Sequence, residues 1–165
     1  MNDARVGLGF DAHRFHAGRP LLLCGVSLPG EVGLEGHSDA DVALHALTDA
    51  ILGALGAGDL GEHFPPDDPR FRDADSRELV RFALGLAGER GFRVANCDLT
   101  IVGERPRVAP HRQQLRAALA ELLGVSVERA SVKATTTEGL GWTGRGEGLA
   151  ALAVVLLCRE ASGGE

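Results

Sequence analysis

The chain has 165 residues and a formal net charge of −6 at pH 7, with 23 acidic against 17 basic side chains. This length fits one domain, and the acidic balance argues against a surface that binds nucleic acid. No apolar run approaches the roughly 18 residues needed to cross a bilayer, so no membrane span is expected. The opening residues lack the pattern of a signal peptide, and the three cysteines form no CxxC pair. A cytoplasmic protein is therefore expected.

The predicted elements follow from runs of apolar residues, their spacing and the turn residues between them. In chain order they are a strand at Val6–Phe10, a strand at Leu21–Val26, a helix at about Ala40–Leu55, a helix from Ser76 to Gly91, a strand at Val94–Val102, a helix at Arg112–Leu123, a strand at Ser131–Thr135 and a strand at Leu149–Leu157. Ser38 or Asp39 is expected to cap the first helix, and Ser76 the second. Residues 56–75, rich in Pro and Asp, are predicted to be irregular.

This order of elements predicts an α+β fold, an α/β sandwich in which a mixed β-sheet carries its helices on one face. Residues 1–160 are expected to form a single domain and residues 161–165 a disordered tail. The last strand, Leu149–Leu157, is apolar at every position, so both of its faces require burial. Loops over a central strand would satisfy this, as would contact with neighbouring subunits. We favour an oligomer, because the helices can cover only one side of a small sheet.

One candidate metal site begins with Asp11-Ala12-His13. The carboxylate and the imidazole are two residues apart, so in an extended chain they point to the same side. Together with His45 from the first helix they would supply three ligands and leave one position open, as in a catalytic zinc site. The alternative is a solvated turn beside a surface histidine.

His45 belongs to a stripe of polar residues on the first helix. Ser38, Asp41 and Asp49 share this stripe because the residues follow one another at helical spacing, opposite the apolar face. An aspartate one turn from the imidazole is expected to orient its second ring nitrogen for metal binding.

A second candidate site lies between Lys133 and Gly148. Three consecutive threonines follow Lys133, and Arg145 lies in a glycine-rich loop, a composition typical of a phosphate cradle. Glu138 adds a hard oxygen ligand for a magnesium ion that bridges two phosphates. The alternative is a threonine-rich strand end followed by an ordinary loop. The long loop at residues 58–69 offers further carboxylates for sugar hydroxyls, although surface loops of this composition are common.

Taken together, these segments resemble the family of 2-C-methyl-D-erythritol 2,4-cyclodiphosphate synthases over nearly the whole chain. The most specific motifs are the runs His37–Ala50, Lys133–Glu138 and Gly144–Gly148. The resemblance implies a homotrimer whose sheets face the threefold axis and whose active sites lie between adjacent subunits. It also implies a phosphorus–oxygen lyase of non-mevalonate isoprenoid precursor biosynthesis. This enzyme would convert 4-diphosphocytidyl-2-C-methyl-D-erythritol 2-phosphate to 2-C-methyl-D-erythritol 2,4-cyclodiphosphate and CMP.

The resemblance assigns metal ligands as well. Asp11, His13 and His45 would bind zinc or another divalent transition metal. Magnesium or manganese would bridge the substrate diphosphate beside Glu138.

Catalytic and substrate-binding positions are implied in the same way. His37 and Thr136 match positions that stabilise the transition state, and Ser38 belongs to a mobile segment over the substrate. The other positions expected to contact substrate are Asp11, His13, Asp59, Leu60, Gly61, Phe64, Pro65, Pro66, Asp67, Asp68, Gly103, Glu104, Arg105, Pro106, Arg107, Val108, Ala109, Thr135, Thr137, Glu138, Trp142 and Arg145. Residues 59–61 and 64–68 match the region that contacts methylerythritol and ribose.

Three positions depart from the usual family pattern. Pro66 stands in place of an aspartate and removes a possible hydroxyl contact, and Trp142 replaces a phenylalanine. Residues 103–109 match the cytidine pocket supplied by a neighbouring subunit, and there Arg107 replaces a lysine, which changes the hydrogen-bond geometry. Some family members hold an isoprenoid diphosphate in the cavity on the threefold axis near the position of Arg145, and the same is a hypothesis here.

Two other functions fit the same residues. A metal-dependent phosphohydrolase would release open-chain phosphates, and a non-catalytic trimer would bind a nucleotide or an isoprenoid diphosphate without turnover. Spacing alone indicates a small oligomeric metal protein that handles phosphates, whereas the particular substrate comes from the resemblance.

Overall fold

The structure, a computed structural model, describes residues 3–65 and 67–159. The tail expected at 161–165 and the departure at Pro66 lie outside these residues. Within them, a five-stranded sheet has the strand order β4-β1-β7-β5-β6. Its strands are β1 (Ala4–His16), β4 (Gly33–Leu34), β5 (Phe92–Val102), β6 (Ala130–Thr135) and β7 (Gly148–Arg159). Strands β5 and β6 run parallel and the other neighbours antiparallel, so the sheet is mixed, as predicted.

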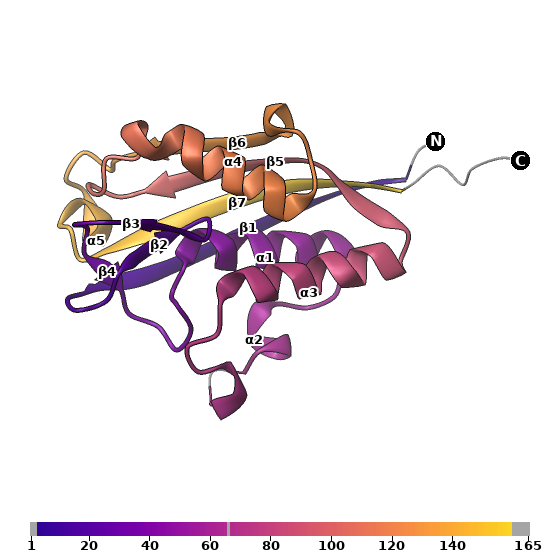
Figure 1. Ribbon diagram of the computed structural model, residues 1–165, viewed down its shortest axis with the longest axis horizontal. Helices are drawn as coiled ribbons and strands as arrows, with labels where there is room; N and C mark the ends of the chain where they lie inside the picture. The colour runs from indigo at the N-terminus through magenta and orange to yellow at the C-terminus, as the bar shows by residue number, and fades with distance from the viewer. Residues whose placement is uncertain (1–2, 66, 160–165) are drawn as a thin grey trace, which may run out of the picture.

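The long helices cover one face of this sheet (Figure 1). They are α1 (Val42–Leu55), α3 (Ser76–Glu89) and α4 (Arg112–Leu123). Helix α1 packs on β1 and β7, α3 packs on α1 and β5, and α4 packs on β6. The predicted α+β fold with helices on one face is therefore confirmed. No helix of the described ranges is long and apolar enough to span a membrane.

The strand predicted at 21–26 folds differently. It is a hairpin of β2 (Leu21–Leu23) and β3 (Val26–Leu28), which pair with each other in a separate two-stranded sheet. The residues between them, Cys24 and Gly25, have φ angles of 54° and 75°. This left-handed backbone reverses the chain, so the apolar run cannot continue as one strand.

Both helix caps lie at residues other than those predicted. Asp41 caps α1, because its carboxylate accepts the backbone N–H of Leu44 at 3.1 Å. Asp75 caps α3 in the same manner. The hydroxyls of Ser38 and Ser76, the predicted caps, are therefore available for other contacts.

The loops contain more structure than the sequence predicts. The segment at 56–75 includes the short helix α2 (Leu60–His63) and a 3₁₀ turn at Pro69–Phe71. The glycine-rich loop after β6 includes the short helix α5 (Gly141–Gly144). Helix α4, by contrast, has the predicted bounds and ends at Gly124, whose φ is 67°.

Helix α1 lies directly against the backbone of β1, because two residues of that strand have no side chain. A Cβ atom on Gly7 or on Gly9 would lie 1.8 Å from a backbone carbonyl oxygen of α1. Alternate residues of a strand point to the same face of the sheet. Asp11 and His13, which continue the row of the two glycines, therefore face the beginning of α1.

The opposite face of the sheet carries apolar side chains that nothing covers within the described residues. Val6, Leu8 and Phe10 of β1 are 67%, 64% and 55% exposed, and Val154 of β7 is 40% exposed. Leu8 and Val154 are direct partners across the two strands. Within the described residues, loops leave Val154 exposed on this face of β7, and it forms an apolar patch with Val6, Leu8 and Phe10.

We predict that Gly9→Ala destabilises the protein by several kcal/mol or prevents folding, because the added methyl would overlap a carbonyl of α1. Gly53→Ala is the control. At Gly53, inside α1, the nearest atom to an added Cβ is 3.9 Å away, so alanine should stabilise by up to about 1 kcal/mol. Urea unfolding measures both, and equal stability of the two variants would contradict this account of the packing.

Candidate metal centre

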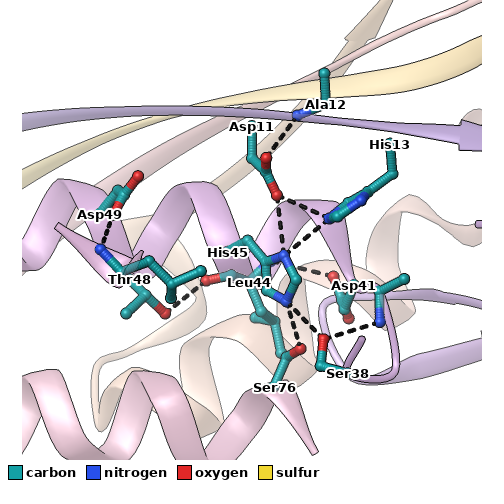
Figure 2. A network of polar contacts seen from close by, with 12 residues as sticks. Asp11, Ala12, His13, Ser38, Asp41, Leu44, His45, Thr48, Asp49 and Ser76 are labelled. Carbon is teal, nitrogen blue, oxygen red and sulfur yellow. Dashed lines mark hydrogen bonds and ion pairs between the residues drawn. The ribbon is translucent and has the colours of Figure 1, made fainter. Parts of the chain in front are cut away.

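Three side chains converge where β1 crosses the start of α1 (Figure 2). The Oδ2 atom of Asp11 lies 2.9 Å from His13 Nε2 and 2.9 Å from His45 Nδ1. The two ring nitrogens are themselves 2.9 Å apart. One ligand atom from each residue lies within 4.8 Å of the others. The structure thus brings together the three residues that the sequence singled out as metal ligands.

The electrostatics of the cluster keep its carboxylate ionised. Burial by itself would raise the pKa of Asp11, but hydrogen bonds to His13 and His45 and the charges of both rings outweigh it. The net effect holds the pKa of Asp11 well below its usual range. A carboxylate that stays charged beside two imidazoles is a donor set suited to a divalent cation.

The second nitrogen of His45 faces two hydroxyl groups rather than an aspartate. Ser38 Oγ and Ser76 Oγ each lie 3.0 Å from His45 Nε2. Ser76 is the first residue of α3, and its hydroxyl also donates to the carboxylate of Asp39. No local pattern predicts this contact, because Ser76 lies 31 positions from His45 in the chain.

The aspartates predicted to orient His45 are occupied elsewhere. Asp41 accepts the backbone N–H groups of Cys24 at 3.2 Å and Gly25 at 2.6 Å, in addition to capping α1. Asp49 accepts the backbone N–H of Leu60 at 2.7 Å. Helical spacing predicted that an aspartate orients the second ring nitrogen of His45, and this prediction is wrong. The two carboxylates instead accept backbone amides from the β2–β3 hairpin and from α2.

The cluster opens onto a cavity of about 470 Å³. Its lining contains part of the predicted site and several residues that the sequence did not indicate. The predicted residues are Asp11, His13, His37, Ser38, His45, Leu60, Gly61, Phe64 and Pro65, and the additional ones are Glu35, Gly36, Phe71, Ala74 and Leu79. Most of the additional residues are apolar, and an apolar residue carries no local signal that it lines a cavity.

The segment that carries His37 and Ser38 is held by a single guanidinium. Arg19 Nη1 donates to the carbonyl of Gly36 at 2.6 Å, and Nη2 donates to the carbonyl of Ser38 at 2.5 Å. The backbone N–H of Asp73 donates to the carbonyl of His37 at 2.7 Å. These bonds place the segment in the lining of the cavity, with Ser38 beside the His45 ring.

The threonine-rich segment lies at the other edge of the sheet. Asp11 of β1 pairs with Ala151 of β7, and Ala151 pairs with Ile101 of β5. Ile101 in turn pairs with Ala134 of β6, the edge strand. Three strand spacings separate β1 from β6, a distance of about 14 Å. Thr136 and Glu138 are exposed there, so the structure does not bring them to the metal cluster of the same chain.

Residues 103–109 lie beside the threonine-rich segment. The N–H of Gly103 donates to the carbonyl of Thr135 at 3.0 Å, and that of Gly139 donates to Glu104 at 3.4 Å. The Oγ1 atom of Thr136 donates to Glu138 at 3.1 Å. The segments predicted to bind diphosphate and cytidine therefore lie together as a second group of site residues, formed by 103–109 and 135–139. This second group is separate from the cavity.

Several charged residues of the predicted sites make local contacts instead. Asp59 caps α2, and Asp68 caps a 3₁₀ turn and pairs with Arg70. Lys133 pairs with Asp98 at 2.6 Å on the sheet, and Arg145 pairs with Glu147 at 2.6 Å. Trp142 lines a small hollow beside His13 rather than the main cavity.

Fold and site together define a class of protein: a mixed-sheet α+β protein with a candidate metal-binding group of one aspartate and two histidines in the lining of a cavity. The comparison with family models then identifies it more closely. The model described as the YgbB family matches residues 4–158, and the chain belongs to this family.

Named relatives agree with this assignment. The 2-C-methyl-D-erythritol 2,4-cyclodiphosphate synthase of Geobacillus kaustophilus is 57% identical over 153 residues, which make up 93% of this chain and 97% of that protein. A structure titled as a 2C-methyl-D-erythritol-2,4-cyclodiphosphate synthase in a CDP-bound form matches with a TM-score of 0.85 at 42% identity, over 93% of this chain and 99% of that one. The bifunctional IspDF of Campylobacter jejuni matches with a TM-score of 0.93 at 43% identity, over 97% of this chain, which spans only 43% of that longer protein.

Asp41 generates a prediction about pH. Burial raises its pKa from 3.8 to about 6, although hydrogen bonds from Gly25 and Leu44 oppose the rise. The folded protein therefore binds this proton more tightly than the unfolded chain. The resulting stability is fully present below about pH 4 and is lost as the pH rises through about 6.

The measurement compares the free energy of unfolding of the unaltered protein with that of Asp41→Asn. The difference, unaltered protein minus variant, should fall between about pH 4 and pH 6. A difference that does not change with pH would show that Asp41 keeps its ordinary pKa when the protein folds.

Proposed function

We propose that this chain is a metal-dependent phosphorus–oxygen lyase of non-mevalonate isoprenoid biosynthesis. It converts 4-diphosphocytidyl-2-C-methyl-D-erythritol 2-phosphate to 2-C-methyl-D-erythritol 2,4-cyclodiphosphate and CMP. The observation that carries the proposal is the convergence of Asp11, His13 and His45 at a cavity, in a chain that belongs to the YgbB family. Its named relatives are cyclodiphosphate synthases.

The reaction requires no nucleophile from the protein. An oxygen of the 2-phosphate attacks the β-phosphorus of the diphosphate in the same molecule, and the new bond closes the ring. The bond from that phosphorus to the oxygen of CMP breaks, and CMP leaves as a phosphate. The protein holds the polyanion in a folded conformation and balances its charge, which is sufficient for an in-line displacement.

The residues of the metal cluster fit a divalent ion, and we propose zinc. Asp11 supplies one anionic oxygen, and His13 and His45 supply two neutral nitrogens. When bound, such an ion supplies positive charge beside a phosphate oxygen. We propose that magnesium or manganese accompanies the substrate diphosphate at Glu138, which is exposed and has a free approach from solvent.

We propose that the substrate is bound by two groups of residues, one in the lining of the cavity and one in the segments 103–109 and 135–138. His37 and Ser38 line the cavity, where we propose that they donate to a phosphate oxygen. Leu60 and Phe64 also line it, and we propose that they contact the methylerythritol part of the substrate. The group at Thr135–Glu138 and residues 103–109 would hold the diphosphate and cytidine.

A complete active site then requires a second subunit. Within one chain the two groups lie about 14 Å apart across the sheet, whereas the substrate must touch both. The exposed apolar patch of Val6, Leu8, Phe10 and Val154 provides the surface for subunit contact. We propose a homotrimer with the sheets facing the threefold axis, formed by a single domain at 1–160 in the cytoplasm.

The activity test incubates the purified protein with the substrate, zinc and magnesium and follows the products by phosphorus NMR. A cyclic diphosphate and CMP are expected, and His45→Ala should lose bound zinc and at least about 10²-fold in turnover. His16→Ala is the control, because His16 is an exposed histidine of β1 outside the cluster. Open-chain phosphates that contain solvent oxygen would indicate a phosphohydrolase, and tight CDP binding without turnover would indicate a binding protein.

The subunit proposal predicts that Leu8→Lys dissociates the trimer, because a charge replaces the apolar contact at the centre of the patch. Sedimentation should show the unaltered protein at three times its 17.3 kDa monomer mass and the variant at the monomer mass. The monomer should keep its zinc but lose turnover. Val127→Lys changes another exposed apolar residue, 42% exposed and outside the patch, and should remain trimeric. A monomeric unaltered protein would overturn the proposal.

A further inference from the structure

We infer that Ser76, oriented by the carboxylate of Asp39, is a positioning residue that fixes the tautomer of His45. In this tautomer Nε2 carries the hydrogen and Nδ1 is free to bind a metal. The inference rests on the proposed role of His45 as a metal ligand. The tautomer itself, however, can be measured in the protein without metal.

The contacts of Ser76 are closed to solvent. Its side chain is fully buried, its backbone N–H donates to Asp39 Oδ2 at 3.0 Å, and its hydroxyl donates to Asp39 Oδ1. The N–H of Asp41 also donates to Asp39 Oδ1, at 3.2 Å. Both oxygens of Asp39 therefore face donors, which is the arrangement of an ionised carboxylate that only accepts hydrogen bonds.

Counting protons gives the direction of the bond to the imidazole. A serine hydroxyl has one proton, and here it points to Asp39. At its second contact, 3.0 Å from His45 Nε2, Ser76 can only accept. Nε2 must then carry the hydrogen, and a neutral imidazole with a hydrogen on Nε2 has its lone pair on Nδ1. Nδ1 is the nitrogen that faces Asp11 and His13 (Figure 2).

The carboxylate of Asp11 favours the opposite tautomer. It lies 2.9 Å from His45 Nδ1, so without a metal it could accept a hydrogen from that nitrogen. His13 Nε2, also 2.9 Å away, can supply Asp11 with a hydrogen instead. In the opposite tautomer the lone pair of His45 Nε2 would face the lone pairs of Ser76, a buried repulsion. Ser76 therefore keeps the hydrogen away from the ligand nitrogen.

Ser38 cannot replace this function. Its Oγ also lies 3.0 Å from His45 Nε2, but the structure gives its hydroxyl proton no carboxylate acceptor within the described residues. It can therefore donate to Nε2 or accept from it, and it suits either tautomer. Of the two hydroxyls at Nε2, only that of Ser76 is bonded to a carboxylate.

The first test measures the tautomer directly. Nitrogen-15 NMR of the metal-free protein, at a pH where His45 is neutral, should find the hydrogen on Nε2. In Ser76→Ala it should move to Nδ1, toward Asp11. In Asp39→Asn the side-chain amide can donate to Ser76, which turns the serine proton toward Nε2, and the hydrogen should again move to Nδ1. A hydrogen on Nδ1 in the unaltered protein would overturn the inference.

The second test measures zinc affinity by competition with a chelator. Ser76→Ala and Asp39→Asn should each lose about 10- to 100-fold in affinity, the usual effect of removing a partner of a metal ligand. Ser76→Thr keeps the hydroxyl and should recover most of it. Thr48→Val is the matched control, since it removes a buried hydroxyl from α1, the helix of His45, and this hydroxyl donates to the carbonyl of Leu44 rather than to the imidazole.

The outcomes separate this inference from the proposed function. Unchanged zinc affinity in Ser76→Ala and Asp39→Asn would overturn the positioning role and leave the lyase intact. If the unaltered protein binds no zinc, the metal proposal fails, while the NMR measurement still decides the tautomer. If Ser76→Ala does not fold, Asp39→Asn and the unaltered protein supply the test.

Discussion

The contact between α1 and the bare backbone of β1 is the constraint on which the site depends. With a Cβ on Gly9 the strand would come within 1.8 Å of a helix carbonyl, so any side chain there would push the helix away. His45 would then lose its contacts of 2.9 Å with Asp11 and His13. The same close packing buries nearly every residue of α1, which obliges each of its polar side chains to find a partner.

Those partners connect the helix and its cap to four of the neighbouring segments. Asp41 holds the turn of the β2–β3 hairpin, Asp49 holds the start of α2, and His45 contacts β1 on one side and the start of α3 on the other. The metal cluster is therefore supported by a network of buried polar groups. Its geometry is preorganised because β1 supplies Asp11 and His13, α1 supplies His45, and the start of α3 contacts the His45 ring.

The second group of site residues differs from the metal cluster in its exposure to solvent. The segments around Thr136 and Glu104 are exposed, bond to one another and lie across the sheet from the cluster. A phosphate-binding segment can be exposed in a single chain and become enclosed only between chains. An uncovered apolar patch on the same sheet provides a physical reason for chains to associate.

The sequence by itself determined the long helices, the main strands and the three candidate metal ligands. The two-residue repeat put Asp11 and His13 on one face, the apolar spacing predicted α1, and Gly124 ended α4 where expected. It could not determine which carboxylates serve His45, because helical spacing describes one element alone. Only the tertiary structure decided that amides from the hairpin and from α2 take Asp41 and Asp49, and that Ser76 reaches the imidazole instead. A buried polar group is satisfied by whatever donor the fold brings near it, and no local pattern records that neighbour.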